Sequence, residues 1–93
     1  MSQKTQTARV QIYTWDTCPY CQRALGLLNS KEIQYEQIRL DGDNDARERM
    51  AQTTKGNRKS VPQIFIDTVS MGGCDDLFYM DSNGELDRLV FGN

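Results

Sequence analysis

The chain has 93 residues, enough for one small domain with a modest hydrophobic core. Its formal net charge is −2, with acidic and basic residues interspersed, which argues against a nucleic-acid or anionic-membrane surface. No apolar run approaches the roughly 20 residues of a membrane span. Residues 1–7 are polar, so we expect a short frayed tail there and not a secretory signal.

Residues 9–14 alternate apolar and polar side chains and predict a strand. Residues 18–29 carry apolar side chains at helical spacing, although Gly26 weakens this helix unless it allows close packing. The less regular residues 33–40 form a second strand candidate. The mostly polar residues 46–54 then predict a second helix.

The second half of the chain predicts two strands followed by two helices. Residues 63–67 and 69–71 indicate an antiparallel hairpin, and residues 74–80 and 85–91 indicate helices. The order β-α-β-α-β-β-α-α predicts an α/β fold, a mixed four-stranded sheet with helices on both faces. If the first β-α-β unit is parallel, its crossover should be right-handed.

The cysteine and histidine counts limit the chemistry of the chain. Three cysteines are an odd number, which argues against a secreted disulfide framework and for a reducing compartment, the cytoplasm. There is no histidine, so the commonest general base and metal ligand is missing. Any nucleophile must therefore be activated by the backbone, by a helix dipole or by a cation.

The motif Cys18-Pro19-Tyr20-Cys21 begins the first predicted helix. With Pro19 as the first helical residue, Cys18 is the cap, where the N–H groups of Tyr20 and Cys21 and the positive end of the dipole stabilise a thiolate. Cys21 lies one turn further along and faces the interior. This asymmetry predicts that Cys18 attacks disulfides and that Cys21 is the resolving cysteine.

Two structural alternatives exist for the cysteine pair. A zinc site needs four ligands, and only Cys74 remains in a chain without histidine. The pair could also be two buried core residues. We favour the redox interpretation because the pair caps a helix directly after a strand, as redox motifs do.

Two further segments are ambiguous when taken alone. The Val61–Pro62 bond could be cis, but the residues by themselves predict an ordinary proline at the start of a strand. Residues 72–76 form a turn and an acidic helix start. Its aspartates could be simple caps, or the N-terminus could bind a carboxylate while Asp75 receives an ammonium group.

Four segments together resemble one protein family. Their order and spacing match that family from about Arg9 to the C-terminus. The segments are Tyr13-Thr14, Cys18-Pro19-Tyr20-Cys21, residues 61–66 and residues 72–77. This combination resembles the glutaredoxins of the thioredoxin-fold superfamily, in their dithiol class. The Trp-Cys-Gly-Pro-Cys of thioredoxins and the Cys-Gly-Phe-Ser of monothiol glutaredoxins are absent. We therefore expect a flexible tail over residues 1–8 and a glutaredoxin domain over residues 9–93.

The resemblance implies a glutathione site formed by Tyr20, Arg58, Val61, Pro62, Gly73, Cys74 and Asp75. The backbone of Val61, before a cis Pro62, would pair with the cysteinyl part of glutathione. The Cys74 N–H and Asp75 would hold the γ-glutamyl end, and Arg58 would bind the glycyl carboxylate. The thiol of Cys74 has no assigned role. Cys74 could be a buried residue of which only the backbone N–H matters, or it could be a third redox cysteine.

The resemblance also implies glutathione as co-substrate, glutathionylated or disulfide-containing proteins as partners, a monomer, and no metal. One alternative is a dimer that binds a [2Fe-2S] cluster with glutathione ligands, which the proline after the first cysteine usually disfavours. Another is a thioredoxin-like reductase fed by a flavoprotein. One position departs from the family: many members carry a lysine three residues before the first cysteine, where this chain has Trp15. Trp15 could simply be a tolerated aromatic side chain that packs on the rim of the site. The sharper hypothesis is that the helix start carries more of the thiolate stabilisation and Arg58 more of the carboxylate binding.

Overall fold

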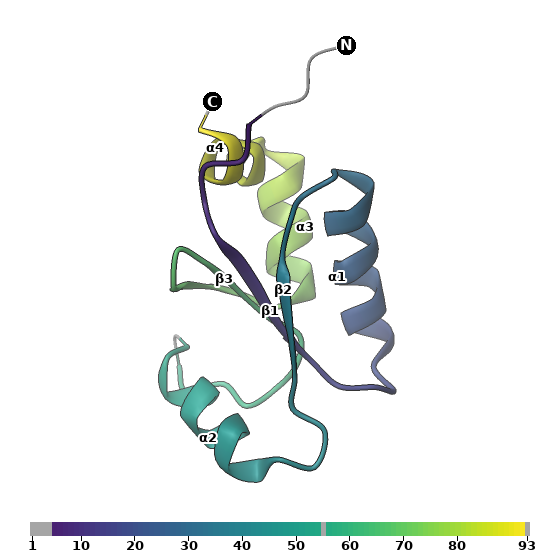
Figure 1. The fold of residues 1–93 in the computed structure, drawn as a ribbon, viewed down its shortest axis with the longest axis vertical. Helices are drawn as coiled ribbons and strands as arrows, with labels where there is room; N and C mark the ends of the chain where they lie inside the picture. The colour runs from purple at the N-terminus through teal and green to yellow at the C-terminus, as the bar shows by residue number, and fades with distance from the viewer. Residues whose placement is uncertain (1–4, 55, 93) are drawn as a thin grey trace.

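The computed structural model describes residues 5–54 and 56–92, which form a mixed four-stranded sheet with helices packed on both faces (Figure 1). The predicted element order is confirmed. The elements are β1 (Val10–Thr14), α1 (Pro19–Ser30), β2 (Glu36–Arg39), α2 (Asn44–Gln52), β3 (Gln63–Ile66), β4 (Val69–Gly72), α3 (Cys74–Ser82) and α4 (Glu85–Phe91). No helix in the described part of the chain is long and apolar enough to cross a membrane.

The strand order β2-β1-β3-β4 explains why distant segments meet at one end of the sheet. β1 runs parallel to β2 and antiparallel to β3, with Tyr13 opposite Gln63. The last residues of β1 therefore lie beside the first residues of β3. The segment that leads from β1 into α1 consequently begins next to Val61 and Pro62, which precede β3.

Strand alternation divides the apolar residues between two faces. One face carries Val10, Ile12, Ile64 and Ile66, which pack with buried side chains of α1, α3 and α4. The other face carries Tyr13 and Phe65, whose rings meet edge to face at 5.5 Å between centroids. Met50 of α2 packs on this second face with Leu40, Trp15 and Val61.

The first helix forms where the apolar spacing predicts it, within one residue. Its inward face consists of Cys21, Ala24, Leu25 and Leu28, all buried. Gly26 is exposed, and a Cβ placed on it meets no atom within 4 Å. Close packing is therefore not the reason for this glycine.

The second predicted strand is too long at its N-terminal side. Ile33 donates its N–H to the Leu28 carbonyl at the end of α1, and Gln34 donates to the side chain of Gln6. These groups are therefore not available to pair with β1, and β2 begins only at Glu36.

The second helix, in contrast, begins earlier than predicted, at Asn44. Asp43 caps it by accepting a hydrogen bond from the Ala46 N–H at 2.9 Å. The helix ends at Gln52, with Thr53 as its C-terminal cap. The cap thus extends the helix towards its N-terminus, and the helix ends two residues before the predicted Thr54.

Part of the predicted flexible tail is held to the domain by hydrogen bonds. Thr7 and Ala8 donate their N–H groups to the Val90 carbonyl of α4, and Gln6 exchanges hydrogen bonds with Gln34. Residues 1–4 lie outside the described residues. The ordered domain therefore includes Gln6, Thr7 and Ala8, ahead of the predicted boundary at Arg9.

Lys31, just after α1, connects three helices. Its ammonium group contacts Asp81 of α3 at 2.7 Å and Asp87 of α4 at 2.9 Å. The hydrogen bond to Asp81, followed by that to Asp87, raises the pKa of Lys31 against the opposing effect of burial. This triad fixes α4 against the end of α1.

Candidate active site

Cys18 occupies the N-terminal cap of α1. Its backbone is extended, with φ −133° and ψ 101°, and Pro19 begins the helix. The Cys21 N–H donates a hydrogen bond to the Cys18 sulfur at 3.1 Å. The predicted cap is therefore confirmed, with Cys21 as the donor. A sulfur held in this way can carry negative charge at the positive end of the helix dipole.

Cys21 differs from Cys18 in its environment. Cys18 is partly exposed, whereas Cys21 is fully buried. Burial, followed by the hydrogen bond with Cys18, raises the pKa of Cys21 to about 12. Cys21 is therefore a protonated thiol near neutral pH, and the two sulfurs differ in burial.

Cys74 lies at the start of α3 and is also buried. Burial raises the pKa of its thiol, and the charges of Asp75 and Cys18 act in the same direction, while Arg23 opposes them. All three cysteines are free thiols in the structure. A buried, protonated Cys74 is a poor nucleophile, since the thiolate is the reactive form.

The segment before β3 reaches the attacking sulfur. The Cys18 Sγ lies 3.9 Å from the carbonyl oxygen of Val61, and the Val61–Pro62 peptide bond is cis. This agrees with the family resemblance and not with the ordinary proline that the residues alone predict. The backbone of Val61 is thus close enough to contact a molecule bonded to Cys18.

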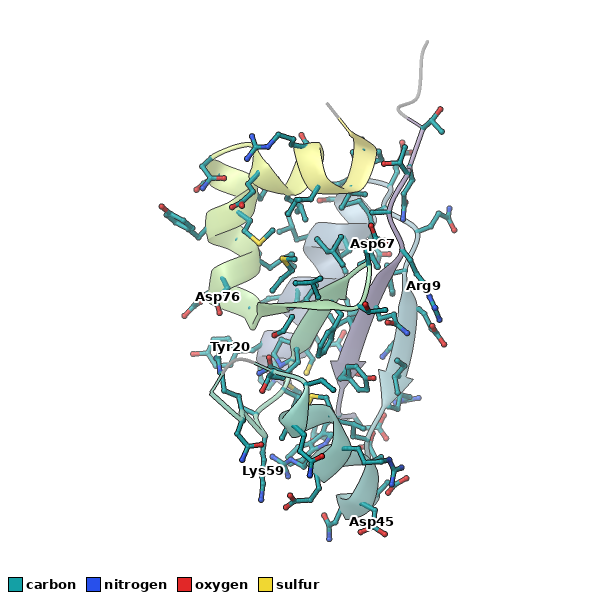
Figure 2. The ribbon with its side chains drawn as sticks, turned by 90° about the vertical axis from the view of Figure 1, so that its left-hand side faces the viewer. Arg9, Tyr20, Asp45, Lys59, Asp67 and Asp76 are labelled. Carbon is teal, nitrogen blue, oxygen red and sulfur yellow. The ribbon has the colours of Figure 1, made fainter. Side chains whose placement is uncertain are left out.

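A groove of about 160 Å³ lies beside this segment. It is lined by all seven residues that the resemblance implies, together with Ser60 and Asp76: Tyr20, Arg58, Ser60, Val61, Pro62, Gly73, Cys74, Asp75 and Asp76. Figure 2 shows Tyr20 of α1 and Asp76 of α3 at the same side of the molecule. The fold therefore gathers residues from three separate segments into one site.

Asp76 caps α3, one of the roles that the sequence allows for the aspartates, and it has a contact with Arg58 that sequence reasoning missed. Its Oδ2 accepts the Gly73 N–H at 2.9 Å and lies 3.5 Å from Nη1 of Arg58. Its place three residues after Gly73 is a typical capping position, which is the signal for the cap, whereas nothing in the local sequence indicates the contact with Arg58. The half-exposed pair with Arg58 is weak, but it connects the two walls of the groove.

The glycines before α3 allow the walls to approach closely. Gly72 has φ +101°, and a Cβ there would lie 2.3 Å from the Asp76 Oδ2. A Cβ on Gly73 would lie 3.3 Å from the Pro62 carbonyl oxygen. The close approach of Gly73 to Pro62 therefore depends on Gly73 having no side chain, whereas Gly72 leaves room for the Asp76 carboxylate.

The lining of the groove carries charges of both signs. Arg58 supplies a guanidinium group on one wall, and Asp75 supplies a carboxylate beside the N–H groups that begin α3. A zwitterionic ligand with a second carboxylate matches this distribution. Among residues 5–54 and 56–92, no group of three or more histidine, cysteine or acidic side chains is arranged to hold a metal ion.

The comparison with known proteins identifies the family. The family model described as Glutaredoxin matches residues 10–71. This chain belongs to the glutaredoxin family. It is 51% identical over 84 residues to a probable glutaredoxin of Synechocystis sp., covering 90% of this chain and 94% of the relative. It is 48% identical over 83 residues to glutaredoxin 3 of Escherichia coli K12, covering 89% and 98%.

A solved glutaredoxin supports the same assignment at the level of the fold. The solution structure of the glutaredoxin from Brucella melitensis superposes with a TM-score of 0.76 at 40% identity and covers 91% of each chain. The fold is therefore thioredoxin-like, as predicted. Membership of the glutaredoxin family brings with it thiol–disulfide oxidoreductase activity.

Proposed function

We propose that this glutaredoxin is a glutathione-dependent oxidoreductase that reduces protein–glutathione mixed disulfides and protein disulfides, as a monomer in the reducing cytoplasm. The observation that carries the proposal is the position of the capped Cys18 sulfur, 3.9 Å from the Val61 carbonyl at the edge of the groove. In this proposal Cys18 is the nucleophile, and the groove binds glutathione.

Glutathione fits the groove by its charges. The Cys74 N–H and Asp75 would receive the γ-glutamyl carboxylate and ammonium, and Arg58 would receive the glycyl carboxylate. The Val61 backbone would align the cysteinyl part with Cys18, and Tyr20 would cover the groove. These contacts would orient the glutathione sulfur for attack by Cys18.

The one-cysteine route has two exchange steps. The Cys18 thiolate attacks the glutathione sulfur of a mixed disulfide, so a Cys18–glutathione bond forms while the substrate disulfide breaks. The protein leaves as a thiolate and takes up a proton. A second glutathione thiolate then attacks the glutathione sulfur bonded to Cys18, which releases glutathione disulfide and regenerates the Cys18 thiolate.

The two-cysteine route uses Cys21 after Cys18. Cys18 attacks a protein disulfide, and Cys21 then attacks the resulting mixed disulfide, so a Cys18–Cys21 bond forms and the protein leaves fully reduced. Two glutathione molecules reduce that bond. The hydrogen bond and the charge of Cys18 help to raise the pKa of Cys21. Both effects are lost once Cys18 is bonded to the substrate protein, which eases deprotonation of Cys21 although burial still raises its pKa.

A glutathione-coupled assay with a glutathionylated peptide tests the proposal. Cys21→Ser should keep deglutathionylation, and Cys18→Ser should abolish it. Retained activity in Cys18→Ser would contradict the assigned nucleophile. Replacing glutathione and its reductase by thioredoxin reductase as the electron source should stop turnover, and full turnover with that source would indicate a thioredoxin-like reductase instead.

A further inference from the structure

The helix α2 contacts the active-site segment through one arginine. The guanidinium of Arg47 lies over the ring of Trp15, with 3.8 Å between its Cζ and the ring centroid. This distance corresponds to a close stacked contact of a planar cation on an aromatic face. The indole nitrogen of Trp15 is buried and makes no hydrogen bond to any of the described residues, so the ring depends on packing and on this stack.

The same guanidinium also holds the wall of the groove. Its Nε donates a hydrogen bond of 2.7 Å to the carbonyl of Lys59, and the Lys59 ammonium pairs with Glu48 of the same helix. Lys59 stands between Arg58 and Ser60, both of which line the groove. Figure 2 shows Lys59 on the side of the molecule that carries Tyr20 and Asp76.

The wall needs such anchors because it has no regular secondary structure between Asn57 and Ser60. Arg58 is held through its N–H by the Thr54 hydroxyl at 2.6 Å, and the Ser60 carbonyl accepts from Gln63 at 3.0 Å. Arg47 supplies the anchor for the residue between them. Without Arg47, the Lys59 peptide loses the bond that ties it to α2.

The Arg47–Trp15 stack also involves the segment that leads to the thiols. Trp15 begins the short segment between β1 and Cys18. Its backbone acts on the buried thiol of Cys21, whose pKa it lowers against the larger effect of burial. The ring also packs in the same cluster as Val61. Arg47 therefore contacts both halves of the site, the thiol segment by its planar face and the groove wall by its Nε.

We propose that Arg47 is a positioning residue for glutathione binding: stacked on Trp15 and bonded to the Lys59 carbonyl, it fixes the Arg58–Val61 wall relative to Cys18. This inference rests on the proposed glutathione-dependent function. Arg47 acts through the wall and touches neither sulfur, so its loss should weaken binding of the glutathione moiety more than it changes the chemistry of Cys18.

The test compares Arg47→Lys, Arg47→Met and the control Arg49→Lys, an exposed arginine on the same helix. Arg47→Lys keeps the charge but loses the planar face and the Nε donor. With a glutathionylated peptide, both Arg47 variants should raise KM roughly 3- to 10-fold while kcat stays within about twofold. Arg49→Lys should match wild type.

Fluorescence provides a readout that is independent of turnover. Trp15 is the only tryptophan of the chain, so its emission should change in both Arg47 variants and stay constant in Arg49→Lys. Trp15→Leu should raise KM as well, and the double variant Trp15→Leu/Arg47→Lys should fall short of the product of the single effects because the two residues form one unit.

Several outcomes would overturn the inference. An unchanged KM in the Arg47 variants, an equal rise in Arg49→Lys, or multiplicative effects in the double variant would each contradict positioning through the stack. A fall in kcat and thermal stability with constant KM would indicate a purely structural role. Wild-type turnover separates the two proposals, because absence of glutathione-dependent activity in wild type refutes the function itself.

Discussion

The N–H of Cys21 donates a hydrogen bond to the sulfur of Cys18 across 3.1 Å, so the two thiols of the motif share one turn of helix while differing in exposure. One sulfur is capped and partly exposed, and the other is fully buried. A pair in which one thiol attacks and the other completes the exchange needs two sulfurs that lie close together and differ in exposure.

Alkylation should distinguish the three cysteines. At pH 8, a thiol with a pKa of about 12 is ionised in only about one molecule in ten thousand, so Cys21 should react far more slowly than Cys18 with iodoacetamide. Cys74, with a raised pKa and little exposure, should also remain unmodified. Peptide mass spectrometry after short exposure measures each site, and Cys18→Ser is the control. Rapid labelling of Cys21 in the folded wild type would contradict this assignment.

Gly72→Ala should destabilise the fold by about 2–3 kcal/mol, because the residue adopts φ +101° and its new Cβ would collide with the carboxylate that caps Gly73. Urea unfolding measures the difference. Gly84→Ala is the matched control: Gly84 has φ +82° with open space around it, so its cost of about 1 kcal/mol should reflect the backbone alone. Equal costs at both positions would show that the contact with Asp76 is unimportant.

Unlike Gly72→Ala, Gly26→Ala should increase the free energy of unfolding, by about 0.5–1 kcal/mol. Alanine is the better helix former, and a Cβ at this position meets no atom within 4 Å. The same urea titration measures it. Activity should stay at the wild-type level, because Gly26 lies on the exposed side of α1. A destabilised Gly26→Ala would indicate that this glycine has a role that its surroundings do not show.

Lys31 should make stability depend on pH in the alkaline range. The folded state raises its pKa above the ordinary 10.5, so its stabilising contribution is complete below that value and is lost as the pH rises through the folded pKa. Lys31→Met should cost roughly 1–2 kcal/mol at pH 7, because two carboxylates lose their charged hydrogen-bond donor. Unfolding measured from pH 9 to the alkaline side of pH 10.5 compares the two chains, because the contribution of Lys31 is lost only above that value. The variant should show a shallower alkaline decline, and parallel curves would refute the assignment.

Local patterns predicted the helix that begins after Cys18 because its signals lie within one stretch of chain: a capping residue, a proline at the first position and an apolar face. The start of β2 was predicted too early because the backbone of Gln34 bonds to Gln6, 28 residues away in sequence. The missed contact of Asp76 has a similar cause. Its carboxylate contacts Arg58, which belongs to another segment.

The amino-acid sequence by itself determined which thiols are present, which of them caps a helix, and that no histidine assists them. These properties depend on residues that are neighbours along the chain. Only the tertiary structure decided how far burial raises the pKa of Cys21, how the antiparallel pairing of β1 and β3 brings Val61 to Cys18, and which cation stacks on Trp15. Desolvation and close contact depend on segments that meet only when the sheet and its helices have packed.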